Sequence, residues 1–414
     1  MPRGAFVLML AVLTGVVTGT GAFVLKWLVE TIAKALMSDA DGVSWLYFFL
    51  PAAGIMLSVL FQRFIIRHRI EHGTEAIKAD IANKDYWLRP DLLYAPVVAS
   101  SLTLGFGGSA GSEGPIAYTG AAVGSNMAKV FRLPPDMMLM MIALGAGAGI
   151  AGIFKSPVGG AMFTIEILRV ELSTILVLGL FAACITAAMT AYLWSGCTPD
   201  VSFTPADSFE PSIIPAVLLL GVFCGLYGSY YRYTAHRTRY WLESFSSHWL
   251  KNIAAAASLG LIVFLFPILY GEGYAVLGDV VNLTHPDLVR HSFFECAGGH
   301  VWGIMAFVAA VLLFKGIAAT LTNSGGGVAG DFAPTLFAGC LAGYLFAMLA
   351  NTVFGSGLDT TTFALVGMAG TMAAIVRAPL MAVFITAEMT WNYEFFLPLA
   401  LAAGVAYFTS RMIN

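Results

Sequence analysis

Two short segments rich in glycine and proline interrupt otherwise apolar sequence. The first is Gly111–Pro115 (GSEGP), which contains Glu113, and the second is Gly330–Pro334 (GDFAP). Proline suits the first turn of a helix and glycine permits the turn before it, so each segment predicts a helix that starts inside the apolar region. A helix start carries unpaired N–H groups and partial positive charge, which are the properties of an anion-binding site.

The chemistry predicted for these segments is the binding of a small anion by backbone N–H groups. An isolated anion costs tens of kcal/mol to move into a low dielectric, so we expect several helix starts to converge. The expected donors are the backbone N–H groups of Ser112, Gly114, Asp331, Phe332 and Ala333. The side chain of Asp331 would repel an anion, so we expect it to point away. The glycines at 120, 124, 339 and 343 are instead expected to serve close helix packing.

Glu113 is the candidate gate. An ionisable residue at membrane depth is costly and is by default a functional candidate. A carboxylate beside an anion-binding helix start mimics the anion, so it can occupy the site and leave when it is protonated. The alternative is a structural glutamate in a salt bridge, but no basic residue lies nearby in the sequence.

The composition indicates the elements that must position these residues. Apolar residues make up 58% of the 414 residues, charged residues only 11%, and the mean hydropathy is +0.81. So few charges cannot cover a soluble surface, which excludes a cytosolic enzyme, a disordered chain and a nucleic-acid binder. The apolar stretches are long and continuous, as in membrane-spanning helices. The first stretch, 5–37, is too long for a signal peptide and predicts a helix.

The basic residues predict the orientation in the membrane. They cluster at 63–89 and 232–251, whereas the segment 195–212 holds acidic residues and no lysine or arginine. By the positive-inside bias, the two basic clusters face the cytoplasm and the segment 195–212 faces outside.

The chain also contains an internal duplication. Gly145–Pro157 and Glu166 match Gly367–Pro379 and Glu388 at a constant offset of 222 residues. The sequence therefore predicts a first transmembrane repeat (1–194), an extracellular linker (195–212) and a second, inverted repeat (213–414). The substrate site is expected between the repeats, near the midplane. Glu166 and Glu388 are expected to cap neighbouring helix ends.

These residues resemble the CLC family of chloride channels and chloride/proton antiporters. Gly111–Pro115 is similar to the family's GxEGP gating motif, and Gly330–Pro334 to its GxFxP motif, whose backbone amides hold the anion. The resemblance implies an all-α, inverted-repeat integral membrane fold with some 16 to 18 tilted or re-entrant helices. It also implies a homodimer with one pore per subunit, a multi-pass location in the bacterial inner membrane, and contact with lipid.

The chain departs from the family pattern at three places. The third anion motif keeps only Gly73, and His72 stands where the coordinating serine is expected; both residues remain candidate anion ligands. Ile167 stands where antiporters carry an inner proton glutamate. No residue up to Asn414 is assigned to the inner tyrosine gate, which the family carries beyond the helix of Glu388.

These departures favour a channel-like or weakly proton-coupled chloride pathway, influenced by voltage or pH and gated by Glu113. The alternative is a proton-coupled chloride antiporter, with water or His72 carrying protons. An intramembrane enzyme is disfavoured, since there is no HExxH and no pair of intramembrane aspartates. The segment 285–296 holds metal-ligand residue types without a recognised spacing, which favours a solvated loop. No metal or cofactor is expected, and no nucleic-acid partner.

Overall fold

The structure is a computed structural model that describes residues 3–37, 45–70, 73–84, 86–198, 210–281, 288–289 and 292–413. The described residues form sixteen α-helices joined by short 3₁₀ and π-helical turns, and they form no strand beyond one isolated bridge. The predicted all-α fold is therefore confirmed.

The helices of the N-terminal half are α1 (Arg3–Met37), α2 (Leu46–Leu60), α3 (Gly73–Ala82), α4 (Ala95–Gly105), α5 (Glu113–Val130), α6 (Pro135–Phe154), α7 (Pro157–Phe163) and α8 (Thr174–Trp194). Those of the C-terminal half are α9 (Ile214–Glu243), α10 (His248–Leu265), α11 (Tyr274–Val281), α12 (Val301–Ser324), α13 (Phe332–Phe354), α14 (Thr360–Val376), α15 (Pro379–Met389) and α16 (Phe396–Ile413). Two π-helical turns continue helices of the first half, η1 (Phe61–Ile66) after α2 and η3 (Thr164–Leu168) after α7.

Long and short apolar helices are mixed in this fold. Within the described ranges, nine helices are long and apolar enough to cross a membrane. Four further apolar helical segments have only 10–17 residues, including 95–105 and 379–389. A perpendicular crossing needs about 20 residues, so these shorter helices end inside the membrane. The protein is a multi-pass integral membrane protein, and α1 confirms that its first apolar stretch is helical.

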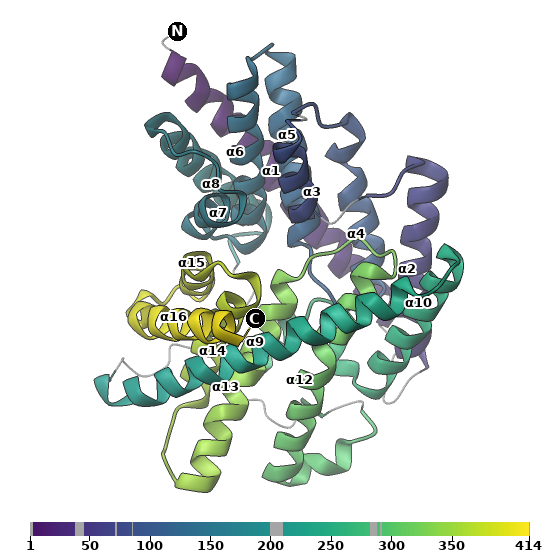
Figure 1. Ribbon diagram of the computed structural model, residues 1–414, viewed down its shortest axis with the longest axis vertical. Helices are drawn as coiled ribbons and strands as arrows, with labels where there is room; N and C mark the ends of the chain where they lie inside the picture. Colours follow the sequence, from purple (N-terminus) through teal and green to yellow (C-terminus); the bar gives the residue numbers. More distant parts are fainter. Residues whose placement is uncertain are drawn as a thin grey trace.

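The two halves occupy different parts of the molecule. In Figure 1, α1 and α5–α8 lie in the upper part, and α12–α16 lie in the lower part. α1 packs against α6 and α8, and α9 packs against α14 and α16 in the same way. The halves meet where α7 contacts α15 and where α2 contacts α10. The repeat boundaries at 194 and 213 stay a prediction, because residues 199–209 of the linker lie outside the described residues.

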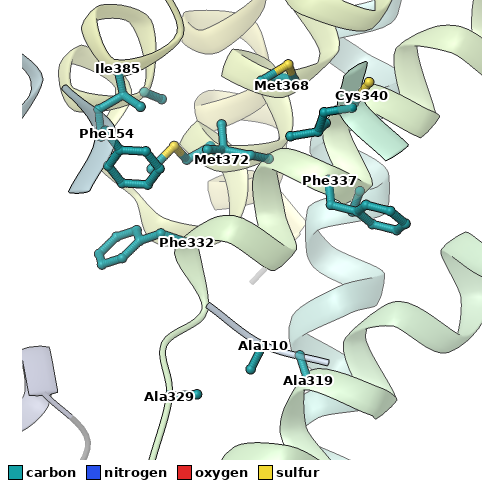
Figure 2. Packing of buried hydrophobic residues seen from close by; sticks show 14 of the residues in the cluster. Ala110, Phe154, Ala319, Ala329, Phe332, Phe337, Cys340, Met368, Met372 and Ile385 are labelled. Carbon is teal, nitrogen blue, oxygen red and sulfur yellow. The ribbon is translucent and has the colours of Figure 1, made fainter. Parts of the chain in front are cut away.

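One hydrophobic core joins the halves. Phe154 of α6, Met372 of α14 and Ile385 of α15 belong to the same buried cluster as Phe332 at the start of α13. Figure 2 shows these side chains together with others of the cluster around the first turns of α13. The first turns of α13 thereby pack against apolar side chains from both halves.

The duplication is visible in local backbone geometry. Lys155 ends α6 and Arg377 ends α14, and both adopt the left-handed conformation, with φ of 53° and 63°. In each half a helix with proline in its first turn follows directly, at Pro157 and Pro379. Two non-glycine residues in a rare conformation, 222 positions apart, confirm the internal repeat.

Glycines bring the paired helices of each half into close contact. A methyl group on Gly120 would overlap the backbone carbonyl of Gly145, and a methyl group on Gly339 would overlap that of Gly367. α5 and α6 therefore touch backbone to backbone, as do α13 and α14. This confirms the packing role expected for Gly120 and Gly339.

This packing gives a testable prediction. We expect Gly367→Ala to lower the free energy of unfolding by about 1–3 kcal/mol, because the added methyl group would force α13 and α14 apart. The matched control is Gly404→Ala in α16, where a Cβ meets no atom within 4 Å. Denaturant titration of the purified protein in detergent measures both. Equal stability of the two variants would contradict the close contact.

Candidate functional site

The two predicted helix starts lie against each other. The N–H of Gly111 donates to the carbonyl of Gly330 at 2.9 Å, and the N–H of Gly330 donates back to the carbonyl of Gly111 at 2.6 Å. Immediately after this pair, α5 begins at Glu113 and α13 begins at Phe332. The sequence prediction that both segments start helices is confirmed.

The start of α3 joins the same place. A methyl group on Gly73 would overlap the backbone carbonyl of Gly114, so the first residue of α3 packs directly on the first turn of α5. Three helix starts therefore converge, as the cost of burying an anion requires. His72, the other residue of this candidate motif, lies outside the described residues, and its role and that of Gly73 stay predictions.

Glu113 is fully buried between these helix starts. Its Oε1 accepts a hydrogen bond from the hydroxyl of Tyr274 at 3.2 Å. Its Oε2 lies against Gly111, beside Ala333 at the start of α13, and has no hydrogen-bond partner in the described part of the chain. The carboxylate therefore lies beside the start of α13.

Other expected donors have different surroundings. The N–H of Ser112 donates to Oε1 of Glu272 at 2.9 Å, so a second carboxylate already holds this donor. The ring of Phe332 packs edge-on against Phe163, with 5.9 Å between centroids. Figure 2 shows Phe332 projecting from the start of α13, with Phe337 further along the same helix.

A buried lysine faces this site. Lys315 of α12 is fully buried, and its Nζ donates to Oγ of Ser109 at 3.0 Å and lies 4.6 Å from the centre of the Phe337 ring. Its charge acts on the carboxylates of Glu113, Glu272 and Asp331. Sequence reasoning missed Lys315. The available signal was a lysine in the middle of an apolar run, which marks a functional candidate.

A cavity of about 210 Å³ lies below the helix starts. Gly73, Gly114 and Ile167 line it. Four charged side chains also line it, those of Glu75, Lys78, Arg239 and Asp331.

Asp331 is exposed to this cavity, and its Oδ1 accepts a hydrogen bond from Nδ2 of Asn323 at 2.8 Å. The Asn323 amide therefore holds its carboxylate at the cavity wall. Among the described residues, no group of three metal-ligating side chains is present. Of the metal-ligand types at 285–296, His285, Asp287 and His291 lie outside the described residues.

The twin glutamates cap helix ends across the two halves. Glu166 accepts hydrogen bonds from the N–H groups of Leu380 (3.1 Å) and Met381 (2.7 Å) at the start of α15. Glu388 accepts hydrogen bonds at the start of α7 from the N–H groups of Val158 (3.1 Å) and Gly159 (2.9 Å), and from the Ser156 hydroxyl (2.5 Å). The capping role expected for both is confirmed.

We therefore expect Glu388→Gln to destabilise the contact between the halves. The amide keeps the shape but loses the charge that strengthens three hydrogen bonds, so the free energy of unfolding should fall by about 1–3 kcal/mol. Glu394→Gln removes an exposed carboxylate nearby and should change it by less than about 0.5 kcal/mol. Thermal unfolding in detergent compares the two, and similar melting temperatures would rule out a stabilising cap.

Fold and site together define a duplicated, multi-pass membrane protein with converging helix starts and buried charges between its halves. Residues 53–411 match the family described as voltage gated chloride channel, so the chain belongs to this family.

The chain is also similar in sequence to named proteins and in fold to solved structures. The chain is 30% identical over 322 residues to the H(+)/Cl(-) exchange transporter ClcA of Vibrio cholerae, a match covering 75% of this chain and 64% of that protein. It is 27% identical over 414 residues to ClcA of Salmonella arizonae, covering 96% and 83%. The fold matches a slow cyanobacterial Cl⁻/H⁺ antiporter at a TM-score of 0.81 and 23% identity, over 100% and 95% of the chains. It also matches a CLC-type fluoride/proton antiporter at a TM-score of 0.76 and 22% identity, over 99% of this chain and 95% of that chain.

Proposed function

We propose that the protein transports chloride across the membrane in exchange for protons, with Glu113 as the gate. The burial of the Glu113 carboxylate between the starts of α5 and α13 carries this proposal. Relatives named as exchange transporters support the exchange mode over the channel-like mode that Ile167 favours. Transport, rather than catalysis, is the proposed activity, and the homodimer implied by the family resemblance is part of the proposal.

Competition between two anions explains the gate. The carboxylate of Glu113 and a chloride ion would use the same partial positive charge at the start of α13. When Glu113 takes up a proton, its negative charge disappears and the helix start becomes available to chloride. When chloride leaves, the deprotonated carboxylate can return. Each cycle then links movement of one proton to movement of the anion.

The proton needs a route on the inner side of Glu113. Ile167 lines the cavity of about 210 Å³ described above but cannot carry a proton. Glu75 and Lys78 of α3 line the same cavity and can be protonated. α3 is outside the candidate membrane spans. Partial burial and the charge of Arg169 lower the pKa of Lys78, so it releases its proton at a lower pH than an ordinary lysine. We propose that Glu75, with Lys78 beside it, passes protons to and from this cavity.

The gate is tested by Glu113→Gln, which mimics the protonated carboxylate. In reconstituted liposomes, an imposed chloride gradient should drive protons uphill through the wild-type protein. The variant should keep chloride flux, lose proton movement, and lose the dependence of chloride flux on external pH. Glu394→Gln is the control with an exposed carboxylate. A variant with the wild-type pH profile would show that Glu113 is not the gate, and running the assay in fluoride compares the two anions.

The inner route is tested by Glu75→Gln. We expect proton flux to fall roughly tenfold, as about 1.4 kcal/mol on a barrier would produce, while chloride flux continues. Asp331→Asn is the comparison. It removes another carboxylate of the same cavity, one that is hydrogen-bonded to Asn323. If the Glu75→Gln variant kept the wild-type ratio of protons to chloride, a chain of water molecules would be favoured as the proton route instead.

A further inference from the structure

A second cavity, of about 330 Å³, lies between the end of α2 and the start of α10. The two helices pack together and lie side by side at the right of Figure 1. Neither Glu113 nor any residue of its site lines this cavity. Six of the residues that line it are basic, namely Arg63, Arg67, His68, Arg69, His248 and Lys251.

The charge of this cavity is unbalanced. Three arginines and a lysine give four permanent positive charges, and no acidic side chain from the described ranges lines the cavity. Arg69 and Lys251 are close enough for their charges to repel, and Arg239 adds to this repulsion.

Two carboxylates act from outside the cavity. Asp91 binds Nε2 of His68 at 2.9 Å but is shared with Arg89 at 2.7 Å, and Glu243 acts on Lys251 from the end of α9. Two partly engaged carboxylates do not balance four permanent cations. A multivalent anion in the cavity would relieve the remaining repulsion.

Apolar side chains flank the basic ones. Phe64 and Ile65, directly after Arg63, are 65% and 66% exposed, and Leu250 and Ile253, on either side of Lys251, are 56% and 52% exposed. Both helices are candidate membrane spans, so we expect these exposed apolar side chains to contact lipid. Arg63 lies 5.1 Å from the centre of the Trp249 ring, and tryptophan is enriched where a membrane meets water. The cavity therefore opens at the membrane interface, beside acyl chains.

We propose that this cavity binds the phosphate headgroup of an anionic membrane lipid. Arginine guanidinium groups match phosphate oxygens in pairs, and basic pockets between membrane helices are suited to such headgroups. A free phosphate ion would satisfy the same cations, but it has no acyl chains to cover Phe64, Ile65, Leu250 and Ile253. The exposed apolar rim therefore favours the lipid.

The test uses purified full-length protein in detergent and native mass spectrometry, with phosphatidylglycerol, phosphatidylcholine or inorganic phosphate added. The wild type should retain phosphatidylglycerol in preference to phosphatidylcholine. Arg69→Gln/Lys251→Gln should reduce this retention at least tenfold, and Arg63→Gln/Arg67→Gln is a second variant of the same cavity. Lys84→Gln/Arg237→Gln removes the same charge from exposed positions outside the cavity and should bind like the wild type.

Three outcomes would overturn the proposal. The first is equal retention of phosphatidylglycerol by the cavity variants and the charge-matched control. The second is displacement of the lipid by inorganic phosphate at equal concentration, which would make free phosphate the ligand. The third is a loss of chloride flux by the cavity variants in vesicles of phosphatidylcholine alone, which would make the cavity part of the anion path.

Discussion

Two backbone hydrogen bonds between Gly111 and Gly330 hold the starts of α5 and α13 together, and the arrangement of the site depends on them. Only glycine allows this approach, because a methyl group on Gly111 would overlap the carboxylate of Glu113, and one on Gly330 would crowd the backbone N–H of Gly114. The first turns of α5 and α13 follow this pair directly and lie side by side. The partial positive charge of two helices adds there, as one helix end alone could not offset the cost of a buried anion.

Three buried or partly buried charged side chains surround these helix starts. Glu113 and Glu272 approach the helix starts from two sides, and Lys315 lies fully buried in contact with Ser109 and acts on both carboxylates. Removing one partner from such a set leaves a buried charge without compensation, which is costly. In the proposed cycle, a chloride ion that enters the site replaces a negative charge rather than adding to it. This constraint makes exchange between chloride and the Glu113 carboxylate physically reasonable.

The sequence predicted well what depends on local pattern and on repetition. Helix starts at Glu113 and Phe332, close packing at Gly120 and Gly339, and capping by Glu166 and Glu388 all follow from residue type and spacing. Lys315 and Tyr274 were not assigned to the site, because their partners Ser109 and Glu113 lie 206 and 161 residues away and only the tertiary fold joins them. The preference for a channel rested on Ile167 and on the absence of a residue assigned to the inner tyrosine gate. The fold brings Glu75 and Lys78 to the cavity that Ile167 lines, and spacing along the chain could not reveal this.

The duplicated halves differ at the residue that begins the paired helices α5 and α13. The offset of 219 residues between the two segments aligns Glu113 with Phe332, so the first residue of α5 is a carboxylate and the first residue of α13 is an aromatic ring. Two carboxylates at these positions would repel each other and leave no charge balance for an anion. Instead, the aromatic ring of Phe332 packs against Phe163, and the carboxylate beside the start of α13 is that of Glu113 from the opposite half. In the proposed cycle, this asymmetry lets one carboxylate and one anion alternate at the start of α13.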